Sequence, residues 1–140
     1  LLAYYQSKNL QNRLKADFSL VTEADLAADN FISSSIQRHF PGERILSEET
    51  ATAASLDAAS GPNLWVIDPL DGTTNYVHDF PCYVVSIGLV IEGHVQLGVI
   101  YDGTRDELFA AARGNGATLN QEPIRCSQHA SHSGQPPRRP

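Results

Sequence analysis

The sequence has few basic side chains and no long apolar run. Its 140 residues include 10 Lys and Arg against 16 Asp and Glu, a formal net charge of −6. A protein that wraps a nucleic-acid backbone needs clustered positive charge, so a nucleic-acid polymer is excluded as a partner. A membrane-spanning helix needs about 20 apolar residues, which the sequence does not offer. We therefore expect a soluble chain that would meet a phosphate only through metal ions.

Cysteine is also scarce. Cys82 and Cys126 are too few for a disulfide scaffold, and neither lies in a CxxC pair. This usage argues against a zinc site and favours a reducing compartment, so the cytoplasm is the default location. Cys82 begins an apolar stretch and is expected to be a small core residue, not a nucleophile.

Both ends of the sequence look unusual. Leu1, Tyr5 and Leu14 place apolar groups along a predicted helix that has no capping residue or Met before it, so we expect the true start to be missing. Residues 126–140 contain three of the eight prolines and are predicted to be a disordered or aberrant tail. The expected domain is therefore residues 1–125.

The pattern between the ends indicates helices packed on a sheet. Thr22 opens a predicted helix that ends at Pro41, and residues 64–67 form a short apolar strand that ends at Asp68. From Tyr83 onward, short apolar runs alternate with glycine turns, which is typical of an antiparallel meander. The first run, residues 83–91, is apolar on both faces and should be covered on both sides. The expected fold class is a layered α/β arrangement.

Residues 65–81, WVIDPLDGTTNYVHDFP, carry the most informative pattern. Asp68 and Asp71 flank a proline that prevents a regular helix, so both carboxylates could face one volume. Mg²⁺ prefers such oxygen ligands, and a bridging aspartate could hold two ions for phosphoryl chemistry. A Gly-Thr turn follows and could present backbone amides to an anion. The alternative is that DPLDG is only a tight turn.

Two upstream acidic features have a structural and a functional interpretation. Glu48 and Glu49 follow an apolar run, so a strand end could bring a further carboxylate to the same place, or they could form an exposed acidic loop. Asp25 stands three residues after Thr22 and could simply cap its helix. Either residue becomes informative only in combination with the others.

In combination, the segments resemble one family. KADFSLVTEAD, ILSEE and WVIDPLDGTTNYVHDFP, in this order, are similar to the inositol monophosphatase family of metal-dependent, lithium-sensitive phosphatases, and residues 85–120 look like that family's sheet. The resemblance spans about residues 10–125. It implies the layered α/β sandwich of the inositol monophosphatase and fructose-1,6-bisphosphatase type, with a largely antiparallel sheet, usually as a homodimer.

The resemblance also implies a metal site. Glu48, Asp68 and the Leu70 carbonyl match ligands of one Mg²⁺, and Asp68 and Asp71 match residues that share a second ion. The complete enzymes of this family use two or three Mg²⁺ ions. A metal-bound water, rather than a side chain, then attacks phosphorus.

The remaining roles concern substrate and proton transfer. Asp71, Gly72 and Thr73 match positions that contact the substrate, and Thr73 and Asp25 match the pair that orients and deprotonates the attacking water. Glu48 would assist through a further metal-bound water. The implied activity is that of a phosphoric monoester hydrolase.

The implied substrate is myo-inositol monophosphate or a similar small phosphate monoester. Related phosphatases that act on 3′-phosphoadenosine 5′-phosphate, fructose 1,6-bisphosphate or histidinol phosphate remain alternatives. The family's second motif, a Trp-Asp pair that supplies another metal ligand, has no match in residues 101–140, and Trp65 is the single tryptophan. The sequence therefore indicates about half of a catalytic unit, and an inactive fragment is the competing hypothesis.

Overall fold

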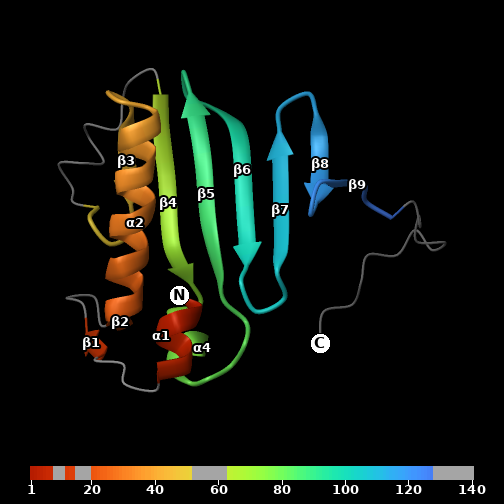
Figure 1. The fold of residues 1–140 in the computed structure, drawn as a ribbon. Helices are drawn as coiled ribbons and strands as arrows, with labels where there is room; N and C mark the ends of the chain where they lie inside the picture. Colours follow the sequence, from red (N-terminus) through yellow and green to blue (C-terminus); the bar gives the residue numbers. More distant parts are fainter. Residues whose placement is uncertain (8–11, 15–19, 52–62, 128–140) are drawn as a thin grey trace, which may run out of the picture.

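The computed structural model describes residues 1–7, 12–14, 20–51 and 63–127. The elements in these residues form helices packed on a curved sheet (Figure 1). The helices are α1 (Leu2–Ser7), α2 (Glu23–His39) and α4 (Thr73–Val77). The strands are β1 (Asn12–Leu14), β2 (Leu20–Thr22), β3 (Arg44–Ser47), β4 (Asn63–Asp71), β5 (Val84–Ile91), β6 (His94–Asp102), β7 (Glu107–Ala112), β8 (Gly116–Leu119) and β9 (Glu122–Ile124).

Strands β3 to β9 form one mixed sheet in chain order, while β1 and β2 make a separate two-stranded ribbon. Among the described strands of this sheet, β3 and β4 pair in parallel and every later pair is antiparallel. Glu92 and Gly93 make the turn between β5 and β6 with positive φ angles of 51° and 76°. The predicted meander and the layered, largely antiparallel α/β fold are confirmed.

Helix α2 begins where the sequence predicts. The Thr22 side chain accepts bonds from the backbone of Ala24 and Asp25, and the Asp25 carboxylate accepts from the Thr22 backbone, which completes a capping box. The helix ends before Phe40, ahead of the Pro41 and Gly42 stop signal. Among the described residues, no helix combines the length and the apolar character needed to cross a bilayer.

In the described residues, the buried apolar side chains form two clusters. One joins α2 to the sheet through Ile36, Trp65 and Ile67. The other lies at the end of β4 and contains Ala24, Leu70, Tyr76 and Tyr83. The Tyr76 and Tyr83 rings pack edge to face, with 4.8 Å between the ring centroids. Figure 1 shows α1 and α4 gathered at this end of β4. The second cluster therefore surrounds the turn that carries the DPLDG motif.

The two faces of the sheet differ in cover. Helix α2 packs on one face, against β4. The opposite face holds a groove of about 620 Å³ that runs from β3 to β9. Within the described residues, the predicted cover of β5 is partial: Ile87 and Leu89 pack against the cluster on the α2 side, but Val85 and Ile87 also line a hollow of about 690 Å³ there. Exposed apolar side chains on the groove side include Val66, Val95 and Ile100.

Three local predictions were wrong. Leu14 lies in β1, so the helix that begins the chain ends at Ser7 instead of continuing to residue 14. Strand β4 continues past Asp68 to Asp71, because a register shift against β5 between these residues accommodates Pro69, which has no N–H for the ladder. Cys82 is exposed because it lies in the loop before β5, outside the core.

Two predicted segments fall mostly outside the described residues. The predicted tail is described only at Cys126 and Ser127, which are exposed and form no helix or strand. The Ala/Ser/Thr-rich connection from Thr50 to Asn63, whose composition predicts a surface loop or weak helix, is described only at its two ends. The proposed division at residue 125 therefore stays a prediction.

Candidate active site

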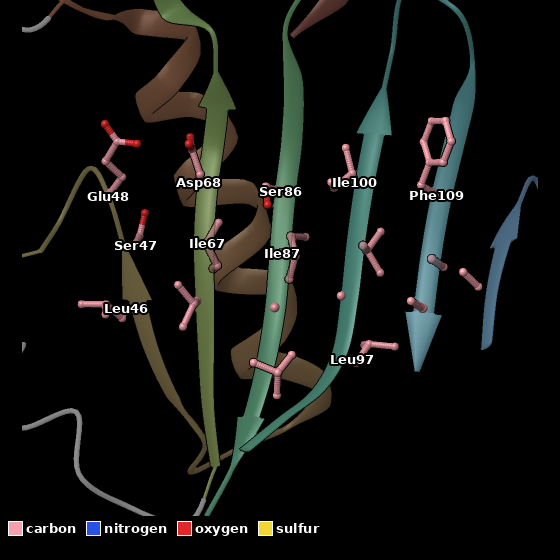
Figure 2. A pocket seen from close by; sticks show the side chains of 18 of the residues that line it. Leu46, Ser47, Glu48, Ile67, Asp68, Ser86, Ile87, Leu97, Ile100 and Phe109 are labelled. Carbon is pink, nitrogen blue, oxygen red and sulfur yellow. The ribbon is translucent and has the colours of Figure 1, made fainter. Parts of the chain in front are cut away.

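Two parallel strands bring the first pair of acidic residues together. In the β3–β4 pairing, Ser47 lies opposite Ile67, and the Glu48 amide donates to the Ile67 carbonyl at 3.0 Å. The carboxyl ends of parallel strands lie at the same edge of a sheet, so Glu48 and Asp68 become neighbours. Figure 2 shows both side chains at the same end of the groove. Glu48 therefore lies directly after β3, beside Asp68, on an exposed turn. Its role as a metal ligand stays a prediction.

The environment of Asp68 is electrostatically unfavourable for a lone carboxylate. Burial, followed by the negative charge of Glu48, raises the pKa of Asp68 from 3.8 to about 6, with a smaller contribution from Asp71. The Leu70 amide donates to Asp68 Oδ1 at 3.1 Å and opposes this rise. Three acidic side chains thus act on one another at the β3–β4 edge.

This donor set fits a hard divalent cation. In the part of the chain that the structure describes, no three or more Asp, Glu, His or Cys side chains form a metal-binding cluster. Mg²⁺ usually takes only one or two carboxylates and completes its shell with waters and substrate phosphate. Two mutually repelling carboxylates, Glu48 and Asp68, meet that requirement, and a divalent cation would offset the repulsion that raises the Asp68 pKa.

Thr73 connects the motif to helix α2. Its hydroxyl lies 3.1 Å from Asp25 Oδ1 and 3.0 Å from the Leu70 carbonyl oxygen, and both are acceptors. One hydroxyl proton can serve only one of them at a time, so the Thr73 oxygen keeps lone pairs for a further donor. Residues 48 positions apart in the chain therefore form one hydrogen-bonded pair.

Asp25 caps helix α2, as one of its two interpretations predicts, and it also contacts Thr73. Its catalytic role stays a prediction. Its Oδ2 accepts from the Thr22 amide at 2.8 Å and from the Thr22 hydroxyl, as a capping residue does. Its Oδ1 accepts from Thr73. The side chain is only 1% exposed. Capping holds the carboxylate rigidly in the orientation that reaches Thr73.

Gly72 makes the turn between β4 and α4. Its φ is 96°, a region that side chains with a Cβ seldom adopt. A Cβ at this position would lie 2.8 Å from the Cys82 carbonyl oxygen. The Tyr76 amide donates to the Gly72 carbonyl at 3.0 Å and closes the first turn of α4. The predicted Gly-Thr turn that opens into a helix is confirmed.

The strand register adds one polar residue that the sequence analysis did not single out. Ser86 on β5 lies opposite Asp68 on β4 and lines the same end of the groove (Figure 2). The sequence contains a signal for this residue, because Ser86 is the one polar side chain in an otherwise apolar strand. The pairing that places it beside Asp68 is not readable from the strand alone.

Known proteins of similar sequence belong to the family that the motifs resemble. Residues 1–136 match the inositol monophosphatase family. The chain is 41% identical to inositol monophosphatase 3 of Solanum lycopersicum, over 91% of this chain and 47% of that protein. It is 48% identical to the inositol-1-monophosphatase of a Synechocystis strain, over 80% of this chain and 38% of that protein.

Solved structures agree with this result. The suppressor protein SuhB of Bartonella henselae superimposes with a TM-score of 0.82 at 36% identity, over 91% of this chain and 49% of that one. An IMPase/NADP phosphatase solved with Mg²⁺ and phosphate has a TM-score of 0.76 at 28% identity, over 87% and 46%. A dual-specificity IMPase/NADP phosphatase was solved with D-inositol-1-phosphate, with a TM-score of 0.72 at 29% identity, over 82% and 42%.

The sequence match, the sheet order and the arrangement of acidic residues agree with one another. The chain spans about half the length of the curated relatives it matches. Over that length, the family match covers nearly every residue, including the strand ends and the turn that carry the acidic side chains. This chain is therefore a member of the inositol monophosphatase family.

Proposed function

We propose that this chain forms the metal- and phosphate-binding part of a Mg²⁺-dependent phosphatase that hydrolyses myo-inositol monophosphate or a similar small phosphate monoester. The observation that carries the proposal is the Thr73–Asp25 hydrogen bond, taken together with the Glu48–Asp68 carboxylate pair. The relatives solved with Mg²⁺ and phosphate and with D-inositol-1-phosphate support it.

Four groups of this chain are proposed to hold the metal. Glu48, Asp68 and the Leu70 carbonyl would hold one Mg²⁺, and Asp68 and Asp71 would share a second. Burial and then the charges of Glu48 and Asp71 raise the pKa of Asp68, and a bound cation would offset the charges of these neighbours. Bound Mg²⁺ supplies a water of lowered pKa and offsets the charge of the phosphate, in a complete enzyme with two or three ions.

The other residues would handle the proton and the substrate. The Thr73 hydroxyl would orient the attacking water. The buried Asp25 carboxylate, which is hydrogen-bonded to Thr73, would accept the proton that the water gives up through the Thr73 hydroxyl. Asp71 and the amides of Gly72 and Thr73 would contact the substrate. Glu48 would assist through a second water. No side chain of the chain needs to act as a nucleophile.

The assignments beyond the site are part of the same proposal. The substrate is a small phosphorylated molecule, the complete protein is a homodimer, and its location is the cytoplasm. The acidic composition favours a small phosphate over a nucleic-acid polymer.

The direct test is phosphate release from inositol 1-phosphate with and without Mg²⁺. Two proteins should be compared: this chain, and a fusion of this chain to the part of the Synechocystis relative that follows the matched region. We expect Mg²⁺-dependent, lithium-sensitive release by the fusion. Turnover of 3′-phosphoadenosine 5′-phosphate, fructose 1,6-bisphosphate or histidinol phosphate in place of inositol 1-phosphate would contradict the substrate assignment.

Asp68→Asn is the mechanistic variant. The amide keeps the size of the side chain but loses the charge that would bridge two ions, so release should fall by about 100-fold or more. Asn115→Ala, an exposed change in the turn before β8, is the control and should leave release unchanged. Undiminished release by Asp68→Asn would refute the bridging role. Comparable release by this chain alone would refute the inactive-fragment hypothesis.

A further inference from the structure

The loop after α4 folds back onto the Gly72 turn. The Phe80 amide donates to the Asn75 carbonyl at 2.8 Å, and the Cys82 amide donates to the Phe80 carbonyl at 2.8 Å. The Asn75 side chain then spans the loop, with Nδ2 donating to the Cys82 carbonyl oxygen at 2.8 Å. One side chain therefore ties the start of α4 to the residue that precedes β5 by two positions.

The Cys82 carbonyl is also the group against which Gly72 packs. A Cβ on Gly72 would come within 2.8 Å of that oxygen and within 3.3 Å of Tyr83. Gly72 therefore lies flush against the Cys82–Tyr83 backbone, with no space for relaxation toward it. Tyr83 is itself buried at 3% exposure, so this backbone forms a firm surface.

The position of Gly72 determines where the Thr73 hydroxyl lies. Thr73 is the next residue, and its Oγ must come within hydrogen-bond distance of Asp25 Oδ1 on α2 and of the Leu70 carbonyl on β4. These distances of 3.1 Å and 3.0 Å leave little tolerance for a rotation about the glycine dihedral angles. Glycine offers no side chain to resist such a rotation, so resistance must come from what packs against it.

We infer that Asn75 is a positioning residue for the Thr73–Asp25 pair: by holding the Cys82 carbonyl against Gly72, it fixes the Thr73 hydroxyl on Asp25. Asn75 does not touch the reacting atoms in this assignment. The inference rests on the proposed function for its catalytic meaning, while the positioning itself is a property of the chain. Loss of the Asn75 amide donor should therefore displace Thr73 and lower turnover. The free energy of unfolding should fall no more than when an Asn donor is lost in another loop.

Asn120 provides the matched control. Its Nδ2 donates to the Asp106 carbonyl at 2.9 Å and its Oδ1 accepts from the Leu108 amide at 2.7 Å, so it ties a loop to the backbone in the same way. It lies in the turn between β8 and β9, at the opposite edge of the sheet from β3. A purely structural effect of losing an Asn donor should appear equally at Asn75 and Asn120.

The first experiment follows backbone amide cross-peaks by NMR in the 140-residue chain. Asn75→Ala and Asn75→Asp both remove the donor, and the two variants guard against a folding failure in one of them. We expect the Thr73 and Asp25 cross-peaks to shift in both variants and to stay in place in Asn120→Asp. Unshifted Thr73 and Asp25 cross-peaks in a folded Asn75 variant would overturn the inference.

The second experiment measures phosphate release from inositol 1-phosphate with Mg²⁺, in whichever of the chain and the fusion releases phosphate. For Asn75→Ala we expect kcat to fall about 10-fold with KM within about 2-fold, and for Asn120→Asp both parameters within about 2-fold. An equal loss of kcat in the two variants would overturn the inference. Absence of release by both wild-type proteins would contradict the proposed function, and the cross-peaks would still decide the positioning role.

Discussion

The two faces of the sheet contain similar side chains in different environments. On the α2 face, Ile67 is 2% exposed, whereas its neighbour Val66 on the groove face is 39% exposed. Along the meander, the groove-side residues Ile100 and Val95 of β6 are exposed as well. An apolar pattern therefore shows that a face is suited to burial but does not identify what buries it.

The largest predicted effect compares two neighbours on β4. Ile67→Ala removes a fully packed side chain and should lower the free energy of unfolding by about 3 to 4 kcal/mol. Val66→Ala should cost less than about 1 kcal/mol, because the groove side leaves this side chain partly exposed. Urea denaturation of both variants provides the measurement. Equal losses would show that the groove face is buried in solution, which would remove the distinction between the faces.

The second prediction compares two glycines of positive φ. Gly72→Ala should cost about 2 to 3 kcal/mol, because the strained backbone conformation is combined with a contact at 2.8 Å to the Cys82 carbonyl. Gly93→Ala, whose Cβ would meet nothing within 4 Å, should show only the conformational cost of about 1 kcal/mol. Thermal and urea unfolding would test the ranking. A similar cost at both glycines would argue against close packing at the Gly72 turn.

The third prediction concerns Asp102, the buried carboxylate of the meander. Hydrogen bonds from Thr104 and Arg105 lower the pKa of Asp102 below 3.8, opposite to the shift at Asp68. The Thr104 hydroxyl donates at 2.6 Å and Arg105 Nη1 at 2.7 Å. Asp102→Asn should therefore cost about 1.5 kcal/mol at pH 7.

The pH dependence of this loss follows from the direction of the pKa shift. A carboxyl whose pKa is lower in the folded state stabilises the fold above its unfolded pKa and loses that contribution as pH falls through the folded pKa. The difference in unfolding free energy between wild type and Asp102→Asn should be complete at pH 7 and shrink as pH drops below 3.8. A difference that grows on acidification would contradict the assignment.

The smallest effect is expected at Val95, which is 67% exposed on the groove face. Val95→Thr keeps the shape of the side chain and adds a hydroxyl, so the free energy of unfolding should change by less than about 0.5 kcal/mol. Self-association measured by sedimentation should decrease, because an exposed apolar patch becomes smaller. A large loss of stability would show that Val95 is covered in solution.

Local signals predicted the elements well and their partners poorly. The capping box at Thr22 and the glycine turn at Gly93 each depend on residues within four positions, so the sequence is sufficient to read them. The end of β4 was misjudged because a register shift against β5 decides how far that strand continues beyond Asp68. Cys82 was misplaced because β5 begins only at Val84, so Cys82 remains in the exposed loop before the strand.

The site residues show the same difference between local signals, which the sequence reveals, and contacts between distant residues, which it does not. A carboxylate at a strand end was readable at Asp68, but spacing alone left Asp25 as either a cap or a functional residue. In the structure, one Asp25 carboxylate oxygen accepts from the Thr22 cap and the other from Thr73, so capping and a contact with the motif occur together. The catalytic role of Asp25 stays a prediction. Family resemblance anticipated that pairing, whereas the contribution of Asn75 depends on a loop conformation that no motif specified.

The parallel pairing of β3 and β4 has a consequence for the order of folding. Arg44 pairs with Leu64 across a long connection, while β5 and β6 are joined by a tight turn at residues 92 and 93. Contacts between distant residues require a larger loss of chain entropy before they form, so local hairpins form faster. The meander can therefore assemble first and serve as a template, and Glu48 reaches Asp68 only when β3 docks. In this order of folding, the repulsion between Glu48 and Asp68 would arise only when β3 docks on a sheet that has already formed.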